Sequence, residues 1–251
     1  MKPRIDPPRA AGAATSPGRP LPAEGLLAAA LALLLGCSRA PAPGTNGGTP
    51  AASTGSAANA PAPSSAGAAA LAQLGRPAPD FELFDARGRA VRLSSFRGRP
   101  VVLEWFDAAC PYVRKWYASG HLPALQRKYT AAGVAWLTLC SSAPGSAGAI
   151  DAANAQATIR ELDLASTALL LDPQGQVARR YRASTALHCF VIDAGGKLVY
   201  SGALDDRPST DPNDIPAARN HVAIDLDALL TAKPVEPHRT TPYGTPLDLA
   251  R

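Results

Sequence analysis

The chain has 251 residues, with 25 Lys and Arg against 20 Asp and Glu. Residues 1–72 hold 11 of the 25 prolines but only five basic and two acidic residues, a composition that excludes a second folded domain there. The remaining 20 basic and 18 acidic residues nearly balance, which argues against a nucleic-acid partner held by bulk charge. About 180 residues suffice for a hydrophobic core without disulfides. Each of the four Cys therefore needs its own interpretation.

The first predicted element is an export signal. Residues 26–35 are an uninterrupted run of Leu and Ala, about half of the roughly 20 residues that a membrane-spanning helix needs. The run ends in LLGC at residues 34–37, which resembles the box of bacterial lipoproteins. The resemblance implies a signal over residues 1–37 and a lipid on Cys37 that anchors the protein to a membrane. Ser38 after this Cys implies the periplasm-facing side of the outer membrane in the bacterial cell envelope. An ordinary signal with a chance Cys is the alternative.

Residues 38–72 are predicted to be a spacer. They are nearly all Ala, Ser, Pro, Gly and Thr, with no aromatic residue. Such a segment buries too little apolar surface to offset the entropy of ordering, so we expect a disordered linker that holds the domain away from the membrane.

Hydrophobic patterning predicts the folded elements that follow. In chain order they are a hairpin of Phe81–Phe84 with Val91–Leu93, a buried strand Val101–Phe106, a helix from Cys110 to Tyr129 broken near Gly120, a buried strand Val134–Leu139, a helix Ala147–Leu162, a strand Ala168–Leu171, a hairpin of His188–Ile192 with Lys197–Ser201, and a last helix from Asn220 to Leu230. Strands that alternate with helices predict an α/β fold whose sheet is covered on both faces. We expect the domain over residues 73–233 and a C-terminal tail over residues 234–251.

Several separated motifs resemble those of one superfamily. The stretches LGRPAPDF at residues 74–81 and LSSFRGRPVVL at residues 93–103 resemble the alkyl hydroperoxide reductase/thiol-specific antioxidant (redoxin) superfamily. The motifs EWF, CPYV, SSAPG and YSGALDD, which begin at residues 104, 110, 141 and 200, narrow the resemblance to its peroxiredoxin-like group. The resemblance implies a thioredoxin-like fold with a central mixed sheet and an N-terminal β-hairpin.

Cys110 is the candidate nucleophile. It follows a buried strand and precedes Pro111, a residue that fits the first turn of a helix. Free N–H groups at that helix start, with Arg114 and Lys115 nearby, would stabilise a thiolate, which attacks disulfides and peroxides. Pro111 and Tyr112 would form the active-site turn. A buried, inert Cys at a strand–helix junction is the alternative.

Two signatures of related enzymes are absent around this Cys. The second Cys of a thioredoxin Cys-x-x-Cys pair would fall on Val113. The Pro and the Thr or Ser of a peroxiredoxin signature would fall on Leu103 and Asp107, and in the other register the peroxidatic Cys itself would fall on Val113. The sequence therefore does not predict a true peroxidase site.

Glu104 interrupts an apolar strand six residues before Cys110, close to where thioredoxins keep a buried carboxylate behind the thiol. A desolvated carboxyl there would have a raised pKa and would carry a proton to and from a leaving sulfur. A Glu paired with a nearby Lys or Arg is the alternative.

Two other cysteines are candidate resolving thiols. Cys140 ends a predicted strand and Cys189 begins another, and either would close a non-local disulfide with Cys110 if the sheet brings their ends together. The alternative is that each is a small core residue.

Two family features are altered in this chain. Where the family has Thr-Pro-His with a cis-Pro, residues 186–188 read ALH. A cis bond before a residue other than Pro costs about 3 kcal/mol, so we expect a trans bond at Leu187 and an altered groove formed by Leu187 and His188. Family members end in Tyr-Gly-Cys, whereas residues 243–245 read YGT, so that partner thiol is missing.

These features predict a membrane-anchored thiol-disulfide redoxin that uses no cofactor. Cys110 would attack a disulfide or an oxidised thiol, and an external thiol donor would supply the electrons through a mixed disulfide. One alternative is a non-catalytic binding module with the same fold. Another is a copper-binding delivery protein with Cys110, His188 and Cys189 as ligands, although a hydrogen-bonded loop histidine is the simpler interpretation of His188.

Overall fold

The computed structural model describes residues 70–251. The predicted signal segment with Cys37, and the predicted linker up to residue 69, lie outside the described residues. Within residues 70–251, every helix is too short or too polar to cross a membrane.

The described residues form one mixed sheet of eight strands in the order β2-β1-β5-β4-β3-β6-β7-β8. Strands β3, β4 and β5 are parallel, as are β7 and β8, whereas the other neighbours are antiparallel. The strands are β1 (Glu82–Asp85), β2 (Ala90–Arg92), β3 (Val101–Trp105), β4 (Ala135–Cys140), β5 (Ala168–Leu171), β6 (Cys189–Ile192), β7 (Leu198–Gly202) and β8 (His238–Arg239). Both predicted hairpins and the predicted mixed α/β architecture are confirmed.

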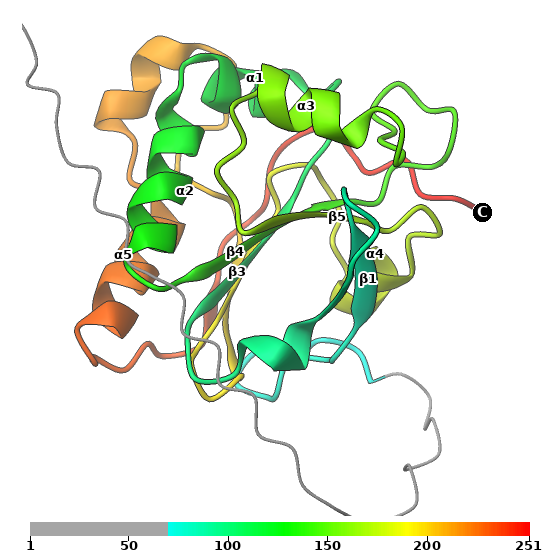
Figure 1. Cartoon of the computed structure of the whole chain (residues 1–251). Helices are drawn as coiled ribbons and strands as arrows, with labels where there is room; N and C mark the ends of the chain where they lie inside the picture. The colour runs from blue at the N-terminus through cyan, green and yellow to red at the C-terminus, as the bar shows by residue number, and fades with distance from the viewer. Residues whose placement is uncertain (1–69) are drawn as a thin grey trace, which may run out of the picture. The chain divides into compact units, whose positions relative to one another are not determined.

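Helices cover both faces of the sheet. They are α1 (Pro111–Ala118), α2 (His121–Ala131), α3 (Ala155–Glu161), α4 (Gln176–Tyr181) and α5 (His221–Leu230), with 3₁₀ turns at Leu93–Phe96 and Pro212–Ala217. Figure 1 shows α2 and α5 on one side of the sheet and α4 on the other. Two separate core clusters fill these two layers, one containing Leu122 and Leu226, the other Val177 and Tyr181.

The central strand β3 explains how one polar residue enters the core. All five of its residues are buried, as expected for a strand covered on both faces. Because side chains alternate along a strand, Val102 and Glu104 face the layer of α1, α2 and α5, while Leu103 and Trp105 face the layer of α4.

The predicted helix Ala147–Leu162 is wrong in its first half, since α3 begins only at Ala155. Asp151 accepts hydrogen bonds from the N–H groups of Ala153 and Asn154, a local pattern that competes with the helix. A Cβ at Gly148 would overlap the carboxylate of Asp107, so this turn packs directly against the segment before Cys110.

Sequence patterning missed α4. Its N-terminus is held by the buried carboxylate of Asp172, which accepts hydrogen bonds from the N–H groups of Gln176, Val177 and Ala178. The signal was an acidic residue placed four residues before a short apolar pattern.

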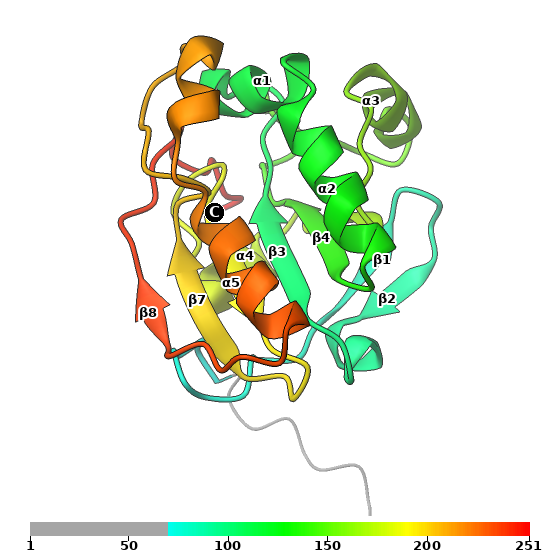
Figure 2. The ribbon, with the colours of Figure 1, turned by 90° about the vertical axis from the view of Figure 1, so that its left-hand side faces the viewer.

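Residues 234–251 are hydrogen-bonded to the domain. Strand β8 pairs with the edge strand β7 (Figure 2). Beyond it, the N–H of Leu247 donates to the carbonyl of Ser184 at 3.0 Å, and the N–H of Ala143 donates to the carbonyl of Asp248 at 2.6 Å. The C-terminal segment therefore runs across the end of the sheet where the predicted site lies.

Candidate active site

Cys110 occupies the N-cap of α1, and Pro111 is the first residue of that helix, as predicted. The N–H of Cys110 closes a tight turn on the carbonyl of Asp107 at 3.1 Å, and the N–H of Arg114 begins the helix on the carbonyl of Cys110 at 3.0 Å. Pro111 is exposed and Tyr112 half-buried, but the side chain of Cys110 has no exposed surface. The thiol thus lies at a helix start but beneath a cover.

The C-terminal segment supplies this cover. The N–H of Thr245 donates to the Sγ of Cys110 at 3.4 Å, and the carbonyl of Thr245 accepts from the N–H of Ala186 at 2.9 Å. Gly244 has a φ of 136°, and a Cβ there would overlap the carbonyl oxygen of Ala186. Only glycine permits this approach. We call residues 243–245 the cover segment.

Tyr243 anchors the cover segment. Its ring packs against the ring of Tyr112 with centroids 5.5 Å apart, and its hydroxyl donates to the carboxylate of Asp205. Burial raises the pKa of Asp205 although this hydrogen bond opposes the shift. The aromatic contact thus joins the cover segment directly to the active-site turn.

Leu187 lies in the core and does not line a groove, which corrects the predicted role. It is fully buried, and its N–H donates to the carbonyl of Trp105 at 2.7 Å. The peptide bonds of residues 70–251 are all trans, including the one before Leu187, as predicted. Leu187 has a φ of 62°, an uncommon conformation for a residue with a branched side chain.

Glu104 is fully buried and pairs with no Lys or Arg among the described residues. Its carboxylate accepts hydrogen bonds from the hydroxyl of Tyr117 at 2.8 Å, the amide of Gln126 at 3.0 Å and the indole of Trp136 at 2.6 Å. Burial raises the pKa of Glu104, although these bonds oppose the shift. The predicted raised pKa is therefore supported, whereas the hydrogen bonds connect the carboxyl to three neutral donors.

The two candidate resolving thiols belong to the same core cluster as Cys110. The Sγ of Cys140 donates to the carbonyl of Gly148 at 3.5 Å, and the Sγ of Cys189 donates to the carbonyl of Leu187 at 3.4 Å. Burial raises the pKa of both thiols. All three described cysteines are free, so a role for either as a resolving thiol stays a prediction.

The copper alternative is not supported by the geometry. Residues 70–251 contain no group of three His, Cys, Asp or Glu placed to hold a metal ion, so Cys110, His188 and Cys189 do not form a ligand set. The His188 ring instead stacks on Phe190 with centroids 4.4 Å apart, and its Nε2 lies 3.1 Å from the Oγ of Ser201. The simpler interpretation, a hydrogen-bonded loop histidine, fits.

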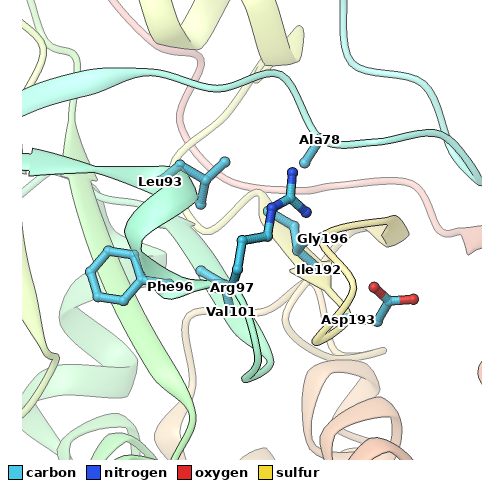
Figure 3. A pocket seen from close by; sticks show the side chains of 8 residues that line it. All are labelled: Ala78, Leu93, Phe96, Arg97, Val101, Ile192, Asp193 and Gly196. Carbon is cyan, nitrogen blue, oxygen red and sulfur yellow. The ribbon is translucent and has the colours of Figure 1, made fainter.

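One apolar pocket lies far along the sheet from this site. Figure 3 shows it beside Val101, at the end of β3 opposite to the Cys110 turn, with Phe96 and Ile192 in its wall. Its volume is about 10 Å³, about the space of one water molecule. It is therefore no substrate site.

The sequence interpretation missed the cover segment as a part of the site. The available signal was the aromatic Tyr243 followed by glycine in a segment with no helix or strand pattern of its own. The resemblance marked position 245 as that of a partner thiol, and the structure places the N–H of Thr245 on the Sγ of Cys110.

The central mixed sheet, the helices on both faces and a Cys-Pro turn at the start of α1 define a thioredoxin-like protein. The sequence matches the AhpC/TSA family over residues 74–201, half of the chain, and the chain belongs to this family. Comparison with the curated proteins gives no match.

Two solved structures share this fold. A hypothetical protein from Sinorhizobium meliloti 1021 is 24% identical with a TM-score of 0.59, and the match covers 71% of this chain and 96% of that one. An uncharacterized conserved protein from Geobacillus kaustophilus is 26% identical with a TM-score of 0.59, and the match covers 71% of this chain and 93% of that one. These similarities support the fold.

Proposed function

We propose that the protein is a thiol-disulfide redoxin that reacts through Cys110. The observation that carries the proposal is the position of its sulfur at the N-cap of α1, where it also receives the N–H of Thr245. Backbone donors at a helix start stabilise a thiolate, which is the reactive form of cysteine. Membership in the AhpC/TSA family supports thiol chemistry for such a Cys.

The proposed reaction has three exchange steps. The Cys110 thiolate attacks one sulfur of a substrate disulfide, so that a mixed disulfide forms and the other substrate sulfur leaves as a thiolate that takes a proton. A thiolate of an external donor then attacks the Cys110 sulfur, so that the second substrate sulfur leaves as a thiolate that takes a proton. A second donor thiolate attacks the donor sulfur bound to Cys110, which forms a donor disulfide and releases the Cys110 thiolate. The substrate gains two electrons, which the donor supplies, so no resolving Cys within the chain is required. Proton transfer by Glu104 stays a prediction, because its carboxylate is bonded to Tyr117, Gln126 and Trp136.

Substrate access requires the cover segment to move. Few bonds hold it over the thiol: one hydrogen bond to Ala186, one to Cys110, one from the hydroxyl of Thr185 to the carbonyl of Tyr243, and the Tyr243 contacts with Tyr112 and Asp205. Segments held by few bonds open locally at low cost. We propose that Cys110 reacts when residues 243–245 lift from it.

The proposed location is the bacterial cell envelope. A lipid on Cys37 would anchor the chain to the outer membrane, and residues 38–72 would give the domain its reach. Radiolabelled palmitate incorporation into the full chain and into a Cys37→Ser variant tests this anchor, and equal labelling of both would contradict it.

The function is tested by trapping the mixed disulfide. The full chain is incubated with oxidised glutathione, and the adduct is located by peptide mass spectrometry. We expect the adduct on Cys110, its loss in Cys110→Ser, and its retention in the matched variants Cys140→Ser and Cys189→Ser. A wild-type chain without adduct, or a Cys110→Ser chain that keeps it, would contradict the proposal.

A non-catalytic binding module is the second candidate, and the complete burial of Cys110 favours it. In that case a partner would bind to the same degree when Cys110 is replaced by Ser, and no exchange with glutathione would occur. The trapping experiment therefore separates the two candidates.

A further inference from the structure

A second cavity borders the loop that carries Leu187, since Ser184 and His188 of this loop line it. Its volume is about 270 Å³, and its walls come from the end of α4, from β6 and β7, and from β8 with the segment after it. Figure 2 shows β7 and β8 side by side at that edge of the sheet. The polar residues that matter here are Arg182, Ser184, His188, Ser201 and Arg239. We call this space the arginine cavity.

The charge in the arginine cavity is of one sign. Arg182 follows α4 and Arg239 lies in β8, and both guanidinium groups are exposed. Neither forms an ion pair or a side-chain hydrogen bond within residues 70–251, and no Asp or Glu of that part lines the cavity. Guanidinium groups match carboxylate or phosphate oxygens in pairs of hydrogen bonds.

His188 determines the hydrogen-bonding role of Ser201 in the cavity. The N–H of Ser184 donates to its Nδ1 at 3.3 Å, so Nδ1 is an acceptor and the hydrogen lies on Nε2. Nε2 then donates to the Oγ of Ser201 at 3.1 Å. Burial lowers the pKa of His188 to about 4, which keeps the ring neutral in this role.

Ser201 is thereby left with a hydrogen to donate. Its Oγ accepts from His188 and donates to no acceptor among the described residues. The nearby hydroxyl of Thr240 is committed, because Tyr200 donates to the carbonyl of Ala203 and so accepts from Thr240. Two guanidinium groups and a free hydroxyl form a set of donors without an acceptor, which suits an oxyanion.

The rest of the wall is apolar. Ala72, Leu74 and Pro242, which are half-buried, line the cavity together with the donors. An inorganic ion would leave this apolar surface uncovered, whereas an organic acid would bury it.

We propose that the arginine cavity binds a small organic carboxylate. The carboxylate lies between Arg182 and Arg239 and accepts the hydroxyl hydrogen of Ser201, while the apolar part of the ligand packs against Leu74 and Pro242. Phosphate shares the anion chemistry but lacks the apolar part. The proposal is independent of the reaction of Cys110.

Binding has a consequence for the cover segment. Arg239 lies four residues before Tyr243 in the same C-terminal segment, whereas Arg182 belongs to the body of the domain. An anion held by both guanidinium groups adds one more bond between this segment and the domain to those that β8 already forms with β7. The bound state therefore keeps Thr245 on Cys110 and slows alkylation of this thiol.

Calorimetric titration of the full chain with sodium phenylacetate tests the proposal, with phenylacetamide and sodium phosphate as matched probes. We expect phenylacetate to bind and phenylacetamide not to bind. Arg182→Gln and Arg239→Gln should each weaken binding roughly tenfold, because each removes a charged donor to the carboxylate. Arg160→Gln, which removes the same charge from exposed α3, should change the affinity less than about twofold.

Three outcomes would overturn the proposal. Equal binding of phenylacetamide would exclude recognition of the charge, and equal weakening by Arg160→Gln would show attraction to net charge only. Phosphate binding as tightly as phenylacetate would exclude the role of the apolar wall and indicate an inorganic anion instead. As a second readout, phenylacetate should slow iodoacetamide labelling of Cys110 in the wild type and not in Arg239→Gln, and unchanged wild-type labelling would refute the link to the cover segment.

Discussion

Cys110 and Cys189 have no exposed surface, yet their surroundings differ in kind. Cys189 lies in β6 opposite Glu104 of β3, and burial, with the charges of Glu104 and Asp205, raises its pKa well above the usual value. Cys110 lies at a helix N-cap and receives a backbone N–H. Equal burial therefore does not imply equal chemistry. The surroundings of Cys189 oppose a negative charge on its sulfur, whereas the sulfur of Cys110 accepts a hydrogen bond from a backbone N–H.

The structural change needed to expose Cys189 also differs from the change needed to expose Cys110. Exposure of Cys189 requires separation of β6 from β3 and β7 in the middle of the sheet. The hydrogen bond to the sulfur of Cys110 comes from Thr245 in the C-terminal segment, so we expect this thiol to become accessible when residues 243–245 lift. Local opening of a terminal segment costs less than opening of central strands, so we expect the native protein to label at Cys110 before Cys189.

The largest expected effect is on the strands that bury Cys189, and it comes from replacing Glu104. Glu104→Ala leaves three buried donors, on Tyr117, Gln126 and Trp136, without their acceptor. At about 1–3 kcal/mol for each orphaned group, the variant should lose at least about 3 kcal/mol of unfolding free energy in urea, and Cys189 should label rapidly.

Glu104→Gln is the matched control for this prediction. It keeps one acceptor oxygen for Gln126 and Trp136, so only the hydroxyl hydrogen of Tyr117 loses its acceptor. We expect it to retain most of the stability and the slow labelling of Cys189. An alanine variant as stable as the wild type would show that the network contributes little.

The second prediction concerns the pH dependence of the unfolding free energy, which depends on His188 in the loop next to Cys189. The folded pKa of His188, about 4, lies below the 6.5 of an exposed imidazole, so between these values the unfolded chain binds the proton first. The contribution of neutral His188 to the unfolding free energy is complete above pH 6.5. It falls by about 3 kcal/mol as the pH falls to 4. His188→Gln should lack this part of the slope of unfolding free energy against pH.

His121→Gln is the control, because His121 is exposed. It should retain the wild-type slope between pH 6.5 and 4. A His188→Gln slope equal to that of the wild type would contradict the assignment of the acid sensitivity to this imidazole.

The third prediction acts on the cover of Cys110 alone. In Gly244→Ala the new Cβ would overlap the carbonyl oxygen of Ala186, so the cover segment must shift. We expect iodoacetamide labelling of Cys110, measured by peptide mapping, to rise by roughly tenfold, equivalent to about 1.4 kcal/mol. Labelling of Cys189 should stay unchanged, since its cover does not involve this segment.

Gly88→Ala provides the strain control. Gly88 also has a positive φ, 74°, but a Cβ there meets no atom within 4 Å. It should cost the backbone strain of a left-handed alanine and leave labelling of Cys110 at the wild-type rate. If both variants accelerate Cys110 equally, global destabilisation explains the result and the cover segment does not control access.

Local patterns were sufficient for much of the domain. Buried strands such as β3 and β4, both hairpins and the break between α1 and α2 at Gly120 followed from periodicity and turn residues. The start of α3 did not follow, because Asp151 redirects the backbone of a segment whose alanines favour helix. Propensity is outweighed there by a side-chain hydrogen bond.

The candidate site divides in the same way. The Cys-Pro turn and the acidic residue six positions before it are sequence-local, so Cys110 and Glu104 could be named in advance. The partners of Glu104 come from α1, α2 and β4, and only the packing of these elements decides that neutral donors, not Lys or Arg, surround the carboxylate.

By itself, the sequence determined the order of the strands and helices other than α4 and β8, and the position of the thiol at a helix start, since both depend on neighbours within a few residues. The tertiary structure alone decided that Thr245 covers a sulfur 135 residues earlier, and that Arg182 and Arg239 line one cavity. Contacts at such separations arise from how the layers pack and where the last segment returns to the sheet. No local periodicity encodes that geometry.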